Sequence, residues 1–499
     1  MKKQKYIYLL ALLPFLAVAV LYEIVPLCSV IGNSFIPDGG SGFSLENYEK
    51  IFTKLLYQKA IINSLKISLT SSLIGIIIAF LGAKAIHNHT GKLSTAFTTV
   101  LNMVSNFAGV PLAFSYMILL GNAGFMVHVG QKLGIQGLAN YNLYTSGGMS
   151  MIYVYFQIPL ATLLLIPAFE GIRREWKEAV ALLGGNMTCF WTKVGIPVLM
   201  PGILGTFSVL FANALAAYAT VYALMMNNIS LLPIQIAGSF VGEVKTGTWR
   251  CVVSCDDGTD GHYDLRDKRN RQTVSERSEE GMTERKKGSA AVMLVLIAYL
   301  LLPLIVTIVY SLFDKWTEIV PHGFSVKSYV ELFQDPEFLL CILRSLIVCV
   351  VPIVLTTVII LLAMFVTNLY FPKLDKYVQI ICMIPYTIQG VILSVSILAA
   401  YVRSDTFLSN RMVMLFGAYS VIIMPYIYQG IKNGLLTVNV YTLVEAAEML
   451  GCSRIYAFFK VVVPNLISSV IVSSLLAVGI IFGDYVLVRN LTGTSFQNM

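Results

Sequence analysis

The sequence Glu178-Ala-Val-Ala-Leu-Leu-Gly184, followed by Lys193-Val-Gly-Ile-Pro197, decides how this chain is organised. It returns in the second half as Glu445-Ala-Ala-Glu-Met-Leu-Gly451, followed by Lys460-Val-Val-Val-Pro464, so the numbering shifts by 267 from each position to its counterpart. In both copies Gly stands six residues after Glu, and Pro stands thirteen after Gly. Each copy is the most polar segment of its neighbourhood and lies between two long apolar segments. The chain therefore presents one polar element twice.

The composition is that of a membrane protein. Of the 499 residues 57% are hydrophobic and 12% are charged, whereas soluble domains carry about 25% charged residues. Apolar segments of about 20 residues recur, which is the length of a membrane-spanning helix. Helices satisfy their own backbone groups in lipid, and the alternation of a membrane barrel is absent. We predict an all-α, polytopic membrane protein with spans at roughly 6–30, 64–86, 100–120, 149–169, 200–225, 290–313, 340–366, 377–401, 412–430 and 465–488.

The two halves of the chain resemble each other beyond the opening sequence. Gly42-Phe-Ser-Leu-Glu-Asn-Tyr48 parallels Gly323-Phe-Ser-Val-Lys-Ser-Tyr329, with a shift in numbering of 281. The shift falls to 267 further on, so the second half is shorter by that difference between its third and fourth spans. We predict two homologous parallel-repeat halves of five to six transmembrane helices each, an arrangement known for transporters. The predicted division is 1–249, a polar linker at 250–288, and 289–499.

Loop charges predict the orientation. Lys2, Lys3 and Lys5 place the N-terminus in the cytoplasm by the positive-inside rule. Counting four crossings then places residues 170–198, with their several basic residues, in the cytoplasm as well. The net charge of +8 comes from such short loops, so it does not indicate nucleic-acid binding.

Residues 250–287 interrupt this pattern, because they are densely charged and have the composition of a disordered linker. Only five predicted spans separate the two copies of the motif, so the copies would face opposite sides of the membrane. A sixth crossing in the first half would restore the same side, and 250–270 is where it should lie. We expect this stretch to replace that helix, and we expect the second half to lack its last span.

The repeated motif predicts two short cytoplasmic helices that meet at a Gly turn. Gly184 follows good helix formers, and glycine is the usual residue at a helix C-terminus because it accepts a left-handed backbone. Glu178 is expected to begin the helix, where its charge favours the positive end. Ala179, Leu182 and Leu183 form an apolar stripe. Such a helix is too short to be stable alone, so it either rests on lipid headgroups or docks in a groove; two identically spaced copies favour docking.

With these residues the chain resembles the permease subunits of ATP-binding-cassette (ABC) importers, which work with a solute-binding protein. The signature of that family is Glu-Ala-Ala, three residues, Gly, nine residues and Ile-x-Leu-Pro. This chain departs from it only conservatively, with Val180 for the second Ala and Val or Ile before Pro. The resemblance covers both halves and fails at 250–287 and past 490. It implies that this loop is a coupling helix for the ATPase, formed by Glu178, Ala179, Gly184, Pro197, Glu445, Ala446, Ala447, Gly451 and Pro464.

The resemblance also implies the partners and the place of action. Two ABC ATPase subunits would bind the cytoplasmic loops, an extracytoplasmic solute-binding protein would deliver a small solute, and the chain would cross the bacterial plasma membrane as a type I importer permease. In this family the ATPase subunits close on ATP, draw the coupling helices together and turn the permease outward. Family members with both halves in one chain often import ferric iron or thiamine, and separate halves often import polyamines or aminoalkylphosphonates.

Several motifs are absent. The sequence has no Gly-x4-Gly-Lys-[Ser/Thr] phosphate loop, and no catalytic triad or metal cluster is apparent. We therefore expect no enzyme activity, no cofactor and no metal in this chain, with ATP hydrolysis on partner subunits. The alternative is an ion-coupled secondary transporter, which would need more ionisable residues within its spans. A membrane scaffold or sensor would need a signalling domain.

Charged residues are few in the predicted spans, and one of them is Asp484. An acid at membrane depth costs about 2.5–3.5 kcal/mol, so it usually faces a cavity or a partner. Asp484 either pairs with a cation such as Arg489 or attracts cations on the solute path, together with Tyr485 and with Tyr218 of the first half. The second role weakly favours a cationic solute. Glu23 and Lys66 are expected at the membrane interface.

Overall fold

The computed structural model describes residues 8–37, 42–89, 91–105, 107, 109–225, 229–242, 279–315, 322–386, 390–402, 406–438 and 440–493. This part of the chain is helical apart from one antiparallel hairpin, β1 (Phe313–Lys315) and β2 (His322–Phe324). In it, eight helices are long and apolar enough to cross a membrane, or ten if each of two bent helix pairs is one span. Each of the ten predicted spans overlaps one of these, which confirms the all-α polytopic fold.

The chain divides into two compact units. Unit 1 comprises Met1–Leu55, Gln235–Gly258 and Tyr329–Met499, and unit 2 comprises Leu56–Ile234 and Thr259–Ser328. Each unit thus combines the first span of one half with later spans of the other half. The predicted linker at 250–288 lies mostly outside the described residues, and so does the expected loss of a crossing at 250–270.

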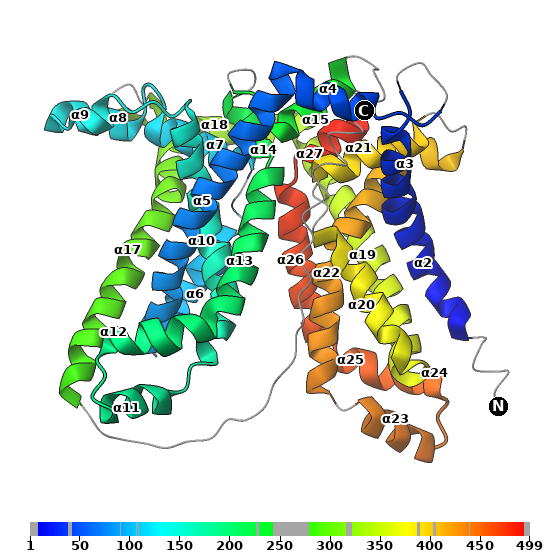
Figure 1. Ribbon diagram of the computed structural model, residues 1–499. Helices are drawn as coiled ribbons and strands as arrows, with labels where there is room; N and C mark the ends of the chain where they lie inside the picture. Colours follow the sequence, from blue (N-terminus) through cyan, green and yellow to red (C-terminus); the bar gives the residue numbers. More distant parts are fainter. Residues whose placement is uncertain are drawn as a thin grey trace. The chain divides into compact units, whose positions relative to one another are not determined.

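Unit 1 is built around one long helix that begins at Arg411 (Figure 1). It packs against its neighbours through small residues: a Cβ added to Gly430 would lie 2.4 Å from the Cβ of Ser473. Such small contacts let membrane helices approach closely. The elements are η1 (Tyr8–Leu12), α2 (Leu13–Ala19), η2 (Val20–Ile24), α3 (Val25–Ser34), α4 (Glu46–Thr53), α19 (Pro336–Leu369), η4 (Pro372–Leu374), α20 (Asp375–Met383), η5 (Ile384–Tyr386), α21 (Gly390–Tyr401), η6 (Phe407–Ser409), α22 (Arg411–Thr437), α23 (Val440–Met449), α24 (Arg454–Ala457), η7 (Phe458–Val462), α25 (Val463–Asn465), α26 (Ile467–Gly483) and α27 (Val486–Thr492).

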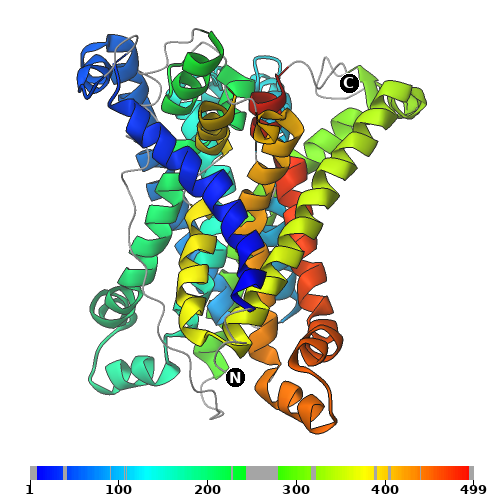
Figure 2. The same cartoon turned by 90° about the vertical axis from the view of Figure 1, so that its right-hand side faces the viewer.

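The first span of the chain lies across α21 and α22 of unit 1 (Figure 2). The Tyr22 ring occupies the place of a side chain at Gly417, where an added Cβ would lie 2.1 Å from a ring carbon. The Tyr401 hydroxyl donates a hydrogen bond of 2.5 Å to the carbonyl of Leu21. The prediction that Glu23 lies at the interface is wrong. Its side chain is fully buried within the first span, because this span packs against the rest of unit 1. Lys66 is exposed on α5 (Leu55–Asn88) of unit 2.

Unit 2 has its core between α7, α10 and α17. The Tyr155 hydroxyl of α10 donates to the carbonyl of Leu300 of α17 at 2.5 Å, and the hydroxyls of Tyr116 and Tyr299 lie 3.4 Å apart. The elements are α5 (Leu55–Asn88), α6 (Lys92–Ser105), α7 (Val110–Leu120), α8 (Phe125–Leu133), α9 (Gln136–Ala139), α10 (Ser146–Glu170), α11 (Arg174–Leu182), α12 (Met187–Phe190), η3 (Trp191–Gly195), α13 (Ile196–Ala216), α14 (Ala219–Met225), α15 (Leu232–Gly242) and α17 (Glu279–Ser311), with α15 and α18 (Lys327–Gln334) at the unit boundaries.

Helix bounds in the two halves match at the shifts found in the sequence. Both ends of α5 (55 and 88) correspond to those of α19 (336 and 369) at the shift of 281. Both ends of α14 (219 and 225) correspond to those of α27 (486 and 492) at the shift of 267, and so do the π-helical turns η3 and η7. The extra residues of the first half fall where α8 and α9 extend from unit 2 (Figure 1). These matches support the parallel repeat, which stays a prediction.

Candidate functional site

The first copy of the motif forms a helix, a glycine turn and a second helix. Helix α11 ends at Leu182, and the Gly185 N–H donates to the carbonyl of Val180 at 2.8 Å. The Gly184 N–H donates to the carbonyl of Ala181 at 3.0 Å. This pair of bonds is the Schellman motif, which needs a left-handed residue, and Gly184 has φ +75°.

The second copy has the same turn. The Cys452 N–H donates to the carbonyl of Ala447 at 3.0 Å, and the Gly451 N–H donates to that of Glu448 at 2.9 Å. Gly451 has φ +83°. The prediction of positive φ is confirmed for both glycines. An added Cβ would meet no atom within 4 Å at either glycine, so close packing within the chain is not the reason for glycine.

Two large apolar side chains stand free immediately before each glycine. Leu182 is 89% exposed and Leu183 87%; in the second copy Met449 is 89% exposed and Leu450 85%. The predicted apolar stripe of the first copy therefore points away from the chain. Met449 and Leu450 were not predicted from the sequence, although they follow from Leu182 and Leu183 by the shift of 267. We call these four residues the apolar pairs. Adjacent exposed apolar side chains in matching places indicate an interaction surface.

The motif glutamates do not begin their helices, so that prediction is wrong. Helix α11 begins at Arg174 and α23 at Val440, which places Glu178 and Glu445 in the second turn. In both copies the helix includes several residues that precede the motif, so its first turn lies before the glutamate. Both glutamates are exposed, as are Ala179 and Ala446, whereas Ala447 is buried.

Each proline lies near the start of an α-helix, although the continuous helix that contains it begins earlier, at Met187 in the first copy and at Arg454 in the second. Pro197 is the second residue of α13, and Pro464 is the second residue of α25. Side-chain caps begin the helix after each turn: Asn186 accepts from the Cys189 N–H at 2.8 Å, and Ser453 accepts from the Tyr456 N–H at 3.3 Å. These caps set the residue at which the helix after each turn begins.

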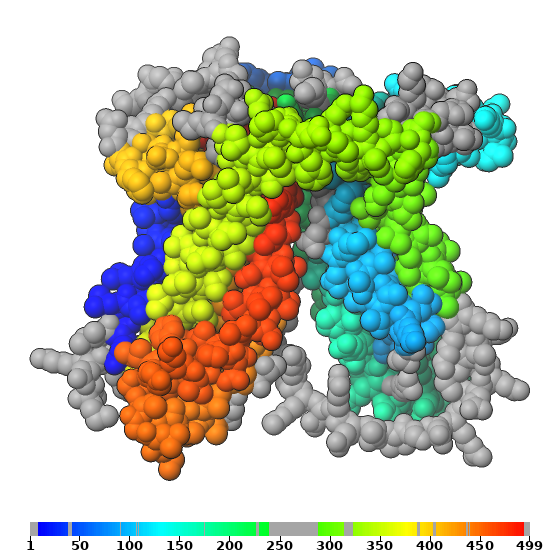
Figure 3. Space-filling view, turned by 180° about the vertical axis from the view of Figure 1, so that it is seen from behind, coloured from blue at the N-terminus to red at the C-terminus, as the bar shows by residue number. Residues whose placement is uncertain are grey.

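Within unit 1, α23 lies at the end where the chain begins. Tyr8 stacks on Tyr370 with ring centroids 4.2 Å apart, and the Tyr441 hydroxyl of α23 donates to the carbonyl of Asn368 at 2.9 Å. Burial raises the pKa of Tyr370 to about 12, so the stack contains a neutral phenol at physiological pH. Residues of α23 to α25 form this end of the unit, shown in orange in Figure 3. With a cytoplasmic N-terminus, α23 faces the cytoplasm.

Asp484 lies at the break between α26 and α27. Its Oδ2 accepts from the Tyr419 hydroxyl at 3.2 Å and from the Leu487 N–H at 3.0 Å. Of the two alternatives for Asp484, the ion pair with Arg489 is not seen among the described residues; the Arg489 guanidinium lies 5.9 Å from the centroid of the Tyr485 ring. Asp484 is partly exposed, and Tyr485 beside it is 41% exposed. Tyr218 belongs to unit 2, where it is buried and stacks on Tyr222.

Comparison with known proteins identifies the fold. A profile described as "Binding-protein-dependent transport system inner membrane component" matches residues 350–499. This chain is an ABC-importer permease. It is 24% identical over 237 residues to the spermidine/putrescine transport system permease protein PotC of Haemophilus influenzae, covering 47% of this chain and 84% of PotC. It is 26% identical over 154 residues to the thiamine transport system permease protein ThiP of Escherichia coli, covering 31% of this chain and 28% of ThiP.

A second Haemophilus influenzae relative, the spermidine/putrescine transport system permease protein PotB, is 28% identical over 194 residues, covering 37% of this chain and 66% of PotB. The permease is accordingly a multi-pass protein of the bacterial inner membrane, and ATPase and binding-protein partners follow in general from its family. These findings do not support the ion-coupled alternative. The relatives are transport permeases, which are not enzymes. No group of three His, Cys, Asp or Glu that could hold a metal occurs among the described residues.

Proposed function

We propose that α11 and α23 are the docking helices of this permease, and that each binds one ABC ATPase subunit. The observation that supports this most is the duplicated turn with its two apolar pairs. Each pair is held by the same Schellman hydrogen bonds and stands free of the rest of the chain. Two equivalent protrusions suit two equivalent grooves, one on each ATPase subunit.

The glutamates and alanines of the motif complete this surface. Glu178 and Ala179 of α11, and Glu445 and Ala446 of α23, are exposed beside the apolar pairs. Gly184 and Gly451 hold the turn, and the prolines lie near the start of α13 and α25. Ala447 differs because it is buried against the chain, so it supports the helix instead of touching the partner.

Binding of the purified ATPase to the permease in nanodiscs tests the docking role. Replacing Leu182 and Leu183 together with Asp should abolish binding to that copy, because a groove that accepts leucine does not accept two carboxylates. The matched variant of the second copy replaces Met449 and Leu450. A control is Leu133→Asp, which changes an equally large exposed side chain, 68% accessible, on α8. Full binding by the variant that combines both double substitutions would contradict the proposal.

We further propose that ATP hydrolysis takes place on these partners and drives import. The sequence has no phosphate loop of its own, and the solute would arrive from an extracytoplasmic binding protein. The repeat supports two permease halves in one chain, with 1–249 and 289–499 as the halves. In proteoliposomes, solute uptake should require both the ATPase and ATP.

The proposed solute is a small cation. Asp484 is a partly exposed residue at a helix break, beside an exposed aromatic ring, Tyr485, an arrangement that attracts organic cations. Tyr218 holds the corresponding place of the first half, next to Ala217, so one half carries the acid. The names of the relatives include spermidine/putrescine and thiamine, which are cations, but also sulfate and 2-aminoethylphosphonate.

Uptake of radiolabelled spermidine, thiamine, sulfate and 2-aminoethylphosphonate by cells that express the complete system tests this assignment. We expect a cationic solute to be imported and Asp484→Asn to reduce its uptake while ATPase binding stays unchanged. Import of sulfate, with Asp484→Asn unaffected, would contradict it.

A further inference from the structure

We propose that a side-chain contact in each half passes the movement of the docking helix to the membrane: Trp191 on Lys84 in the first half, and Phe458 on Phe365 in the second. This inference rests on the docking role proposed above. In both halves the aromatic residue opens the π-helical turn after the docking helix, and its partner lies on the second span of that half. We call these pairs the transmission contacts.

In the first half the transmission contact is a cation–π interaction. The Lys84 ammonium of α5 lies 4.5 Å from the centroid of the Trp191 ring. A Cβ added to Gly195 would lie 2.6 Å from an atom of the same ring, so the absence of a side chain there makes room for Trp191. Phe80 and Phe169 border the ring, with centroids 5.9 and 6.2 Å away. The Trp191 ring is therefore held in one place on α5.

In the second half the contact is between two aromatic rings. The Phe458 ring of η7 meets the Phe365 ring of α19 edge-on, with centroids 5.2 Å apart. Phe458 is fully buried. Phe365 also meets Tyr370, 5.5 Å away, which joins the contact to the stack with Tyr8.

The two contacts occupy equivalent places in the repeat, although their chemistry differs. Lys84 and Phe365 are related by the shift of 281, and Trp191 and Phe458 by the shift of 267. Each transmission contact thus joins a residue from the part of the repeat with the shift of 281 to a residue from the part with the shift of 267. The duplicated helices bring the same two positions together in both halves. π-Helical turns are frequent at functional sites, and here each lies between the short helix after the glycine turn, α12 or α24, and the helix that follows.

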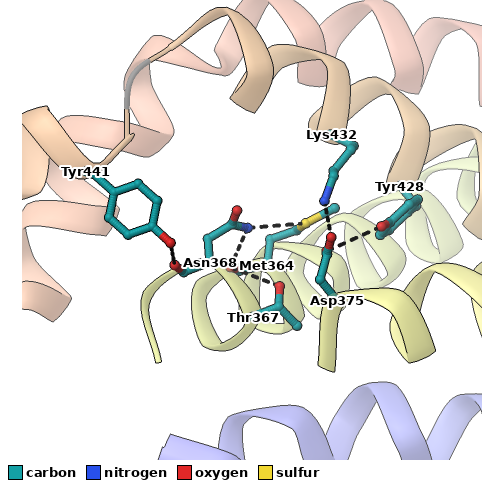
Figure 4. Close-up of polar contacts among 7 residues, drawn as sticks. All are labelled: Met364, Thr367, Asn368, Asp375, Tyr428, Lys432 and Tyr441. Atoms are coloured by element: carbon teal, nitrogen blue, oxygen red, sulfur yellow. Dashed lines mark hydrogen bonds and ion pairs between the residues drawn. The ribbon is translucent and has the colours of Figure 1, made fainter. Parts of the chain in front are cut away.

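The second half adds a polar clamp that the first half lacks (Figure 4). Lys432 of α22 forms an ion pair with Asp375, the first residue of α20. The Tyr428 hydroxyl lies 3.5 Å from Oδ1 of the same carboxylate. At the other end of this loop, Tyr441 of the docking helix binds the carbonyl of Asn368. The segment 368–375 is therefore tied to α22 at one end and to α23 at the other.

The first half cannot form this clamp, because Ser94, Leu165 and Ala161 stand at the places of Asp375, Lys432 and Tyr428. The first docking helix is held by its transmission contact and by the packing of Trp176 and Val180 on the core of unit 2, whereas the second has the transmission contact and the clamp. Loss of the contact should uncouple the first half more than the second. Lys84, Trp191, Phe365 and Phe458 are positioning residues, since they act through the docking helices.

The test compares ATPase binding with the number of ATP molecules hydrolysed per solute imported, in proteoliposomes with the complete system. Lys84→Met removes the cation and keeps most of the side-chain volume, and Lys84→Arg keeps the cation. We expect Lys84→Met to leave ATPase affinity within about twofold and to raise the ATP-to-solute ratio about fivefold, the order of a cation–π interaction. Lys84→Arg should keep the wild-type ratio of ATP hydrolysed to solute imported. Phe365→Leu should raise the ratio less, because the clamp remains.

The outcomes separate the two proposals. An unchanged ratio in Lys84→Met would overturn the transmission role, and so would a loss of ATPase binding in this variant, which would show that Lys84 merely supports the fold. Failure of docking itself would appear in the substitutions of the apolar pairs.

A separate test concerns the clamp. Asp375→Asn should weaken coupling, and Asp375→Lys combined with Lys432→Asp should recover it. A combined variant no better than Asp375→Asn would refute the clamp.

Discussion

The left-handed glycines Gly184 and Gly451 offer the sharpest test of the docking turn. Each closes a Schellman motif at a positive φ (φ +75° and +83°), where a residue with a Cβ costs about 1–2 kcal/mol because the Cβ approaches the following carbonyl oxygen. No neighbouring atom would meet that Cβ, so the cost is one of backbone conformation alone. Since about 1.4 kcal/mol is a factor of ten, Ala should lower the population of the turn about 5- to 30-fold.

The substituents should rank by how well they accept the left-handed region. Asn adopts it readily, so Gly→Asn should bind the ATPase almost as well as glycine does. Ala should raise Kd about 5- to 30-fold, and Val, which is β-branched, more than Ala. Both Val variants should insert normally and lose transport-linked ATPase activity. Kd would be measured by titrating the purified ATPase into permease in nanodiscs, with insertion checked by the yield of folded protein.

A matched control is Gly134, which has φ +69° after α8 and likewise no atom within 4 Å of an added Cβ. Gly134→Val carries the same backbone cost far from α11 in the chain, and it should leave ATPase binding intact. Unchanged transport-linked ATPase activity in both Gly184→Val and Gly451→Val would refute the reasoning. If Asn were as harmful as Val, the partner would approach the glycine closely, and φ would not be the cause.

Three further predictions follow from the same structure. Glu178→Lys and Glu445→Lys should weaken ATPase association in a pull-down, because both glutamates are exposed beside the apolar pairs; full retention by the double variant would contradict this. Glu23→Leu should raise the melting temperature in detergent, because both carboxylate oxygens are buried without a hydrogen-bond partner among the described residues, which costs about 1–3 kcal/mol; a lower melting temperature would show an unseen partner. Single cysteines at 188 and 455 in a Cys-free background should both be labelled from the cytoplasm, because the Tyr8 contact places α23 at the N-terminal end of unit 1; labelling of 455 from outside would show that an odd number of crossings separates the copies.

Much of the membrane architecture was predictable from local sequence. Lipid offers the backbone no hydrogen bonds, so each apolar segment of sufficient length must be a helix, and ten segments could be placed without knowing their neighbours. The glycine turns were predictable for a similar reason. The conformation of Gly184 depends on the residues within one helical turn, and the sequence carries that information twice.

The details of the docking helices were harder to predict. The motif suggested that Glu178 begins its helix, yet α11 begins at Arg174, because helix ends depend on caps and contacts that the motif does not contain. The sequence left two roles open for Asp484, and neither named the bonds that it accepts from Tyr419 and the Leu487 N–H. These partners come from a neighbouring helix and from the next turn of the chain, and hydropathy says nothing about either.

By itself, the sequence determined the fold class, the span positions, the shifts between the halves and the repeated docking turn, because each depends on composition or on residues close together in the chain. Tertiary structure alone decided that the first span packs in unit 1 and buries Glu23, that the apolar pairs stand free, and that Lys84 meets Trp191. The bond from Tyr401 to Leu21 joins residues 380 positions apart. Contacts of that range arise only when whole helices pack, and their selection depends on the shape of both surfaces, which no local pattern contains.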